Sequence, residues 1–277
     1  TVDIADTWED LYTVDLPVEL YRVADVDEND VYTATKQFDE LAKAISDISS
    51  KTTADDWEKM AKTAADIADK GSLTADEVID VSNGRGNVTG VKTGLYLVYA
   101  KPANSARFGY TFVPYLVSAP NNEFAMTGSG SDSWIYDDID IELKPEQTGL
   151  MGSLQINKTL KKYNTALGEQ VFAFDVEDYE RDGNVEFSDI ASIRFDSTGA
   201  KSVVIDNIPA GSRVIVKEVY AAGSYQVTSS DSIETQIVAG ETADVDFTND
   251  YNDKLIYSTG VVNHFEYDGT GWEWVQN

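Results

Sequence analysis

Strict alternation of apolar and polar residues runs through the second half of the chain. Beyond residue 152, short segments in which every second residue is apolar are separated by turn residues, at spacings of about eight to twelve residues. The segments are SLQINKTL, QVFAFDVE, ASIRFD, KSVVIDNI, SRVIVKEVY, SYQVTSS and ADVDFTNDY. This rhythm predicts an antiparallel β-sandwich domain over residues 150–253.

The first half mixes helical and strand periodicity. Residues 16–24 (LPVELYRVA) predict a strand, and the segments VTGVKTGLYLVYA, GYTFVPYLVSAP and WIYDDIDIELKP predict more strands after residue 87. Between them, two sets of apolar residues fall at helical spacing, and Thr53 with Asp56 forms a capping-box pattern before the second set. The sets are Phe38, Leu41, Ala42, Ile45 and Ile48, then Trp57, Met60, Ala61, Ala64 and Ile67. We therefore expect residues 1–146 to form a β-sandwich with a helical insertion at about 36–80.

Two shorter segments complete the predicted organisation. Residues 144–152 (KPEQTGLMG) combine Pro and Gly without periodicity, so we place the domain boundary there. Residues 254–277 contain VVNHFEY and WEWVQ around the turn DGTG, which predicts a hairpin whose domain assignment stays open. The predicted fold class is mainly β, with two immunoglobulin-like antiparallel sandwiches in series.

Composition narrows the possible functions. Asp and Glu number 49 against 21 Lys and Arg, a net charge of -28, so we expect no binding to nucleic acid or to anionic membranes. There is no run of 18 apolar residues and no signal-peptide pattern in residues 1–20, which fits either a cytosolic protein or a trimmed mature one. With one histidine and no cysteine, a Cys/His pair and a zinc cluster are excluded, and we expect neither an enzyme nor a cofactor.

Strand parity places three polar side chains on apolar faces of the second domain. Lys158 shares its face with Leu154, Ile156 and Leu160, because successive strand residues point to opposite sides. By the same count Asn249 lies with Val245, Phe247 and Tyr251, and Glu218 with Val214, Val216 and Tyr220. Buried charges are costly unless they are paired, so this trio needs an explanation.

Two interpretations are open on parity alone. In the first, Lys158 and Glu218 form a buried ion pair beside Asn249, or they lie on edge strands and prevent these strands from pairing with other chains. In the second, a lysine without water loses its proton and becomes a nucleophile, while a buried carboxylic acid stays neutral and donates a hydrogen bond. Against an Asn side chain, these groups can form a Lys–Asn isopeptide bond and release ammonia.

Residues 152–251 resemble the CnaB-type domains of Gram-positive surface proteins and pilins. The resemblance rests on GSLQINKTL, NIPAGSRVIVKEVYAAGSY and DVDFTNDY. It implies that Lys158 and Asn249 are joined and that Glu218 promotes the reaction. One departure is Ala221-Ala222-Gly223-Ser224-Tyr225, where the family has Ala-Pro-x-Gly-Tyr, and this puts the shape of that loop in doubt.

Residues 14–146 resemble the N-terminal domain of sortase-assembled pilins. The matching pieces are LYRVADVD, TGLYLV, YTFVPYLVSAP and a Trp-led last strand ending in LKP. The family often carries a polymerisation lysine in a Tyr-Pro-Lys ending, whereas here the order is Leu143-Lys144-Pro145. Lys144 is therefore interpreted as a solvated lysine, a weak candidate only. Since no lysine lies on an apolar strand face here, we predict no isopeptide bond in this domain.

Two acidic stretches have partial calcium-loop spacing. Residues 178–189 (DYERDGNVEFSD) place acids or amides at the ligand positions, but Glu180 and Asp189 depart from the pattern and the flanks read as strands. Residues 25–30 have D-x-D-x-N, with Lys36 at position 12. We favour solvated turns and predict no metal site, with calcium at 178–189 left as the alternative.

The sequence as a whole indicates an extracellular structural protein of the cell wall or a pilus, stabilised by an internal amide instead of disulfides. The partners implied by the resemblance are other pilin subunits or the cell wall, joined through sortase. The alternatives are an adhesin module that binds a host protein or glycan, with loops such as 121–133, and a secreted hydrolase. The shaft, base or tip role and the ligand are not encoded in any motif that we identify.

Overall fold

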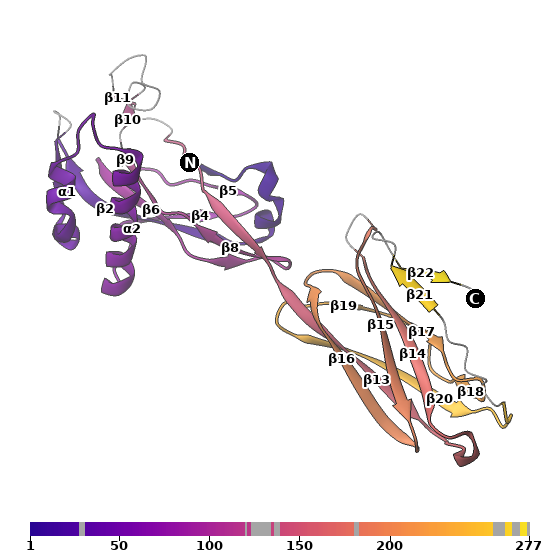
Figure 1. Ribbon diagram of the computed structural model, residues 1–277. Helices are drawn as coiled ribbons and strands as arrows, with labels where there is room; N and C mark the ends of the chain where they lie inside the picture. Colours follow the sequence, from indigo (N-terminus) through magenta and orange to yellow (C-terminus); the bar gives the residue numbers. More distant parts are fainter. Residues whose placement is uncertain are drawn as a thin grey trace. The chain divides into compact units, whose positions relative to one another are not determined.

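The chain forms two compact units, Thr1–Gly149 and Leu150–Asn277, each built mainly from β-strands (Figure 1). The computed structural model describes residues 1–27, 31–119, 121–122, 134–135, 139–179, 183–256, 264–267 and 272–275. The predicted mainly β fold class is confirmed. Each unit is considered by itself below.

The first unit is organised around one long strand. β2 (Leu16–Val26) pairs with β3 (Tyr32–Ala34), β4 (Glu77–Val81) and β6 (Gly94–Ala100), and β6 pairs with β9 (Tyr115–Ala119). The first half of β2 contributes to one apolar cluster and its second half to another. A smaller sheet has the order β12-β8-β7, with bounds Pro145–Gly149, Phe108–Phe112 and Ala103–Asn104. Two short pairs are β1 (Val2–Asp3) with β5 (Arg85–Gly86), and β10 (Asn121–Asn122) with β11 (Trp134–Ile135).

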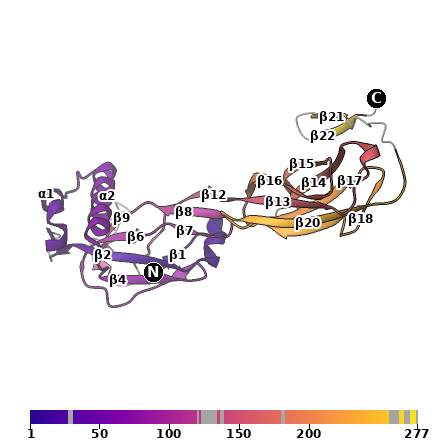
Figure 2. The same ribbon diagram turned by 90° about the horizontal axis from the view of Figure 1, so that it is seen from below.

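The helical insertion covers one face of the main sheet. It comprises the 3-10 helix η2 (Lys36–Leu41), α1 (Ala42–Ser46) and α2 (Ala54–Gly71), and Figure 1 and Figure 2 both show α2 lying along that sheet. The predicted capping box is confirmed, since the Asp56 backbone N–H donates to Thr53 Oγ1 at 3.2 Å and the Thr53 N–H donates to Asp56 Oδ2 at 3.0 Å. A further 3-10 helix, η1 (Asp6–Thr13), was not predicted, because DTWEDLYT buries only Leu11 and so carries no helical apolar stripe.

The division between the two units, after Gly149, falls within residues 144–152, where the sequence placed the domain boundary, but the segment is mostly strand. Pro145–Gly149 forms β12, which pairs with β8, and Met151 opens β13, so Leu150 alone separates the two strands. Pro145 is the first residue of an edge strand, where its missing N–H costs no ladder bond. Gly152 lies where a Cβ atom would stand 2.5 Å from the carbonyl oxygen of Val238, so glycine here marks close packing instead of flexibility.

The second unit is a sandwich of two four-stranded sheets. One has the order β16-β13-β20-β18 and the other β15-β14-β17-β19. The strands span β13 Met151–Leu160, β14 Gln170–Tyr179, β15 Val185–Phe195, β16 Gly199–Pro209, β17 Arg213–Tyr220, β18 Tyr225–Val227, β19 Ser232–Gln236 and β20 Thr242–Tyr251, with the 3-10 helix η3 at Thr165–Leu167. One apolar cluster joins both sheets. All pairs are antiparallel except β13 with β20, which lie side by side and parallel (Figure 1).

The C-terminal segment contributes a separate strand pair. β21 (His264–Tyr267) and β22 (Trp272–Val275) pair antiparallel, with His264 opposite Val275 and Tyr267 opposite Trp272. The pair forms a two-stranded sheet of its own.

Candidate functional site

The three polar residues singled out by strand parity meet in the core of the second unit. Lys158 on β13 and Asn249 on β20 come from neighbouring parallel strands, in a register that places Lys158 beside Phe247 and Leu160 beside Asn249. Glu218 reaches them from β17 in the opposite sheet. The site therefore joins the first and last strands of the sandwich under a carboxyl group from the facing layer.

The three side chains form a closed hydrogen-bonded ring. Lys158 Nζ donates to Asn249 Oδ1 at 2.5 Å and to Glu218 Oε2 at 2.6 Å. Asn249 Nδ2 donates to Glu218 Oε1 at 2.7 Å. Every polar group of the trio thus has a partner, as buried polar atoms require. The amine already touches the carboxamide group that it would attack.

Water is excluded from the ring. The side chains of Lys158 and Glu218 are both 0% exposed, and the Asn249 residue is 0% exposed. Burial lowers the pKa of the Lys158 amine from its ordinary value, while its hydrogen bond and its charge interaction with Glu218 partly oppose that shift. A lowered pKa increases the fraction of neutral amine, which is the nucleophilic form.

Three phenyl rings surround the Lys158 amine. Nζ lies 4.9 Å from the ring centroid of Phe172, 5.5 Å from that of Phe174 and 5.8 Å from that of Phe247. The rings supply the apolar surface that desolvates the amine, although their faces also attract its cationic form. Parity within QVFAFDVE and DVDFTNDY could have found all three, because each shares the inward face of its strand.

Glu218 is placed to move a proton between the two nitrogen atoms. Its Oε2 accepts from the attacking amine and its Oε1 accepts from the amide nitrogen that would leave. A protonated Glu218 that polarises the Asn249 carbonyl and also shuttles protons is the role that the resemblance and the sequence argument suggest for this acid. In the structure that oxygen faces the lysine, so the carboxyl group contacts the leaving nitrogen.

Backbone contacts hold the ring in place. The Glu218 N–H donates to the carbonyl of Asp231 at 2.8 Å, and the Lys161 N–H donates to that of Asn249 at 2.9 Å. Beside Glu218, the pairing of β14 with β17 shifts register between Ala173 and Phe174. Bulges of this kind often re-aim side chains next to functional sites.

The other sequence candidates lie away from this site or outside the described residues. Lys144 is exposed, with Nζ 5.6 Å from the Tyr115 ring centroid. By strand parity Asn263 shares an apolar face with Val261, Phe265 and Tyr267, which makes it the alternative cross-link partner of Lys158 in the sequence. It lies outside the described residues, as do 180–182 and 28–30 of the two acidic stretches. Within the described ranges, no group of three or more His, Asp or Glu side chains is arranged to hold a metal ion.

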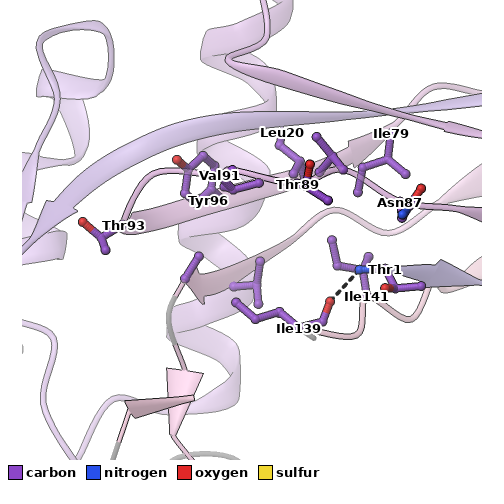
Figure 3. A pocket seen from close by; sticks show the side chains of 14 residues that line it. Thr1, Leu20, Ile79, Asn87, Thr89, Val91, Thr93, Tyr96, Ile139 and Ile141 are labelled. Atoms are coloured by element: carbon purple, nitrogen blue, oxygen red, sulfur yellow. Dashed lines mark hydrogen bonds between the residues drawn. The ribbon is translucent and has the colours of Figure 1, made fainter. Parts of the chain in front are cut away.

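A separate hollow of about 390 Å³ lies in the first unit (Figure 3). Leu20, Ile79 and Val117 supply apolar surface, and Thr89 and Thr93 bring hydroxyl groups. Among the described residues that line it, none is Asp, Glu, His, Lys or Arg. The described lining therefore contains no pair of carboxylates of the kind used in glycoside hydrolysis.

Comparison with known proteins finds one family model that is similar to part of the second unit. Residues 154–252 match a family described as a domain of unknown function, DUF5979. No curated protein matches the chain. In the described part of the chain, no helix has the length and apolar character needed to cross a bilayer.

Solved structures similar to the chain include Gram-positive pilins. One is the minor pilin GBS52 of Streptococcus agalactiae, at 16% identity and a TM-score of 0.28, over 89% of this chain and 87% of that one. Another is a double mutant of the shaft pilin SpaA of Lactobacillus rhamnosus GG, at 8% identity and a TM-score of 0.30, over 92% and 97%. A streptococcal ancillary pilin matches at 14% identity and a TM-score of 0.30, over 90% and 67%. The functional argument below rests on the side-chain geometry of the buried ring.

Proposed function

We propose that this chain is a structural protein of the Gram-positive cell surface, a pilin subunit or wall-anchored stalk, whose second unit is locked by a spontaneous isopeptide bond. The bond joins Lys158 Nζ to Asn249 Cγ, and Glu218 promotes its formation. One observation carries the proposal: a fully buried amine, carboxamide and carboxyl group in mutual hydrogen-bond contact. Assembly through sortase and display outside the cell belong to the same proposal.

The reaction proceeds in two balanced steps. The neutral amine of Lys158 adds to the Asn249 carboxamide carbon, and the proton that the amine loses passes to Glu218 Oε2. Glu218 Oε1 supplies a proton to Nδ2, the C–N bond breaks, and ammonia leaves. The carboxyl group ends as it began, so Glu218 acts as a proton shuttle. The folded core holds the reacting atoms together, which replaces a bimolecular encounter by an intramolecular one.

The main effect of the bond would be mechanical, because it would carry tension directly between two strands of the second unit. Its two residues are 91 positions apart and lie on the first and last strands of the sandwich. By analogy with disulfide loop closure, such a link stabilises the fold by about 4–5 kcal/mol. A pull on the ends of the unit would pass from β13 to β20 through covalent bonds, so the residues between them would carry no load. We accordingly propose no turnover of an external substrate.

The first experiment is the intact mass of the purified chain. The wild-type protein is expected to weigh one ammonia less than its sequence, and a digest should contain a peptide that links Lys158 to Asn249. Glu218→Ala should restore the full mass. The matched control is Asn157→Ala on the outer face of the same strand, where Asn157 Nδ2 donates to Asp244 at 3.1 Å, and it should keep the deficit.

Two results would overturn the assignment. A wild-type protein of full mass would leave Lys158 and Glu218 as a buried ion pair. A peptide that links Lys158 to Asn263 would keep the chemistry but make Asn249 the wrong partner.

A further inference from the structure

A second asparagine, in the first unit, is exposed at the tip of a tight hairpin. β4 and β5 are connected by residues 82–84, and within this turn Asn83 and Gly84 lie between the bridged residues Ser82 and Arg85, with φ of 51° and 80°. Ser82 and Arg85 close the turn, their backbone N–H groups donating to each other's carbonyls at 2.9 and 3.2 Å. These are the features of a two-residue type I′ turn, for which Asn-Gly is the preferred pair. It is the only Asn-Gly pair in the chain.

The groups needed for a backbone attack on this asparagine are free. The Asn83 side chain is exposed and makes no hydrogen bond within the described part of the chain. The Gly84 N–H likewise has no acceptor among the described residues. Glycine carries no side chain that would shield its nitrogen from the neighbouring carboxamide.

We propose that Asn83 is a site of spontaneous deamidation that gradually loosens strand β1. The Gly84 nitrogen adds to the Asn83 side-chain carbonyl carbon and loses its proton to solvent, which gives a five-membered tetrahedral intermediate. Solvent returns a proton to Nδ2, the Cγ–Nδ2 bond breaks, ammonia leaves, and the ring becomes a succinimide. Water then opens the ring, at one carbonyl to give aspartate and at the other to give isoaspartate. No enzyme and no co-reactant other than water is needed.

The consequence for β1 follows from the contacts of Gly84. The Ile4 N–H donates to the Gly84 carbonyl at 2.8 Å, and the Tyr12 ring lies so close that a Cβ on Gly84 would stand 2.5 Å from it. Isoaspartate inserts one extra carbon into the main chain at position 83, which displaces Gly84 from both partners. It also adds a negative charge near Asp3, whose Oδ1 accepts from Arg85 Nε at 3.1 Å. Both changes weaken the pairing of Val2 and Asp3 with β5.

The chain contains a matched internal control. Asn207 is also exposed and also has a left-handed backbone, with φ of 62°, but Ile208 follows it. The β-branched side chain of Ile208 shields the attacking nitrogen. The two asparagines therefore share exposure and a left-handed backbone but differ in the residue that follows and in their setting, since Asn207 lies within β16.

The experiment ages the folded protein in mildly alkaline buffer and maps its peptides with fragmentation that separates isoaspartate from aspartate. Conversion at Asn83 should rise with time and exceed that at Asn207 several-fold, with isoaspartate among the products. Hydrogen exchange at the Ile4 amide should accelerate in the aged protein, and aged Asn83→Ser should show neither change.

Three results would count against the proposal. Equal conversion at Asn83 and Asn207, or conversion only in denaturant, would show that the folded turn is inert. Unchanged protection of Ile4 after conversion would refute the loosening of β1. Because a succinimide at Asn83 also lacks one ammonia, the mass test of the cross-link is best repeated in Asn83→Ser, so that the failure of either idea leaves the other testable.

Discussion

The two units fill their cores differently. Every buried polar or charged residue found in the described ranges belongs to the second unit, including Lys158, Glu218 and Asn249. The first unit buries apolar side chains in two clusters, and its lysines pair at the surface, as Lys43 does with Asp47 and Lys70 with Asp66. Exposed pairs of this kind contribute little, about 0–1 kcal/mol. A buried amine beside a carboxyl group is costly to keep, and this contrast between the units is the reason for the bond proposed above.

The largest expected effect is that of Glu218→Ala. It removes the proposed catalyst and leaves the Lys158 amine buried without its carboxyl partner. The loss combines the missing loop closure, about 4–5 kcal/mol, with a buried charge left unpaired, about 3–5 kcal/mol. Calorimetry should show the transition of the second unit falling steeply while that of the first stays in place.

The control for Glu218→Ala is Glu234→Ala. Glu234 pairs with Arg213 at 3.0 Å on the surface of the same sheet, and we expect its loss to cost at most about 1 kcal/mol. If both variants lower the same transition equally, the buried ring has no special role in stability.

A smaller effect is expected from Gly152→Ala at the start of β13. The added methyl group would meet the Val238 carbonyl oxygen at 2.5 Å, so strand or loop must move, at a cost of about 1–3 kcal/mol. Urea unfolding of the second unit measures the change. An unchanged free energy of unfolding would show that residues 238–241 can shift at little cost, and that close packing at Gly152 does not fix the start of β13.

Much of the site could be predicted from the sequence because burial in a strand follows a period of two. Lys158, Glu218 and Asn249 are each a polar residue in a row of alternate apolar positions, and this pattern can be recognised from the sequence alone. Which strands pair is not visible, since the parallel contact of β13 with β20 joins segments 91 residues apart. The orientation of the Asn249 carboxamide, and so which of its atoms faces Glu218, depends on that contact and could not be predicted from the sequence.

The pH dependence of stability gives a third test, in the variant Asn249→Ala, where the Lys158 amine persists. Burial lowers the pKa of Lys158 in the folded state, so the unfolded chain binds more protons between the folded value and the unfolded value near 10.4. Stability must then rise with pH across that window, by up to about 1.4 kcal/mol per pH unit. Urea midpoints measured at increasing pH give the slope.

The control for this slope is the double variant Lys158→Met/Asn249→Ala. It has no amine at position 158 and should lack the rise in stability. Equal slopes in the two variants would show that other groups cause the pH dependence.

A loss of about 1 kcal/mol, confined to the first unit, is expected for Thr53→Ala. The substitution removes the acceptor of the Asp56 N–H and with it one side of the capping box of α2. Thr63→Ala on the same helix is the control, because the Thr63 hydroxyl only donates back to the Lys59 carbonyl. A shift in the transition of the second unit would contradict the independence of the two cores.

Calcium should have no effect on either unit. In residues 178–189, the side chain of Asp178 is buried in the core while that of Asp189 is exposed, although a calcium loop would need both at its two ends. Both residues lie within paired strands and not in a loop, because the register of β14 and β15 sets Asp189 opposite Val176 and Asp178 opposite Phe187. Millimolar calcium should therefore leave both melting transitions unchanged. A rise in the transition of the second unit that Asp182→Ala abolishes would instead establish a bound ion, because a ligand that binds only the folded state must raise its stability.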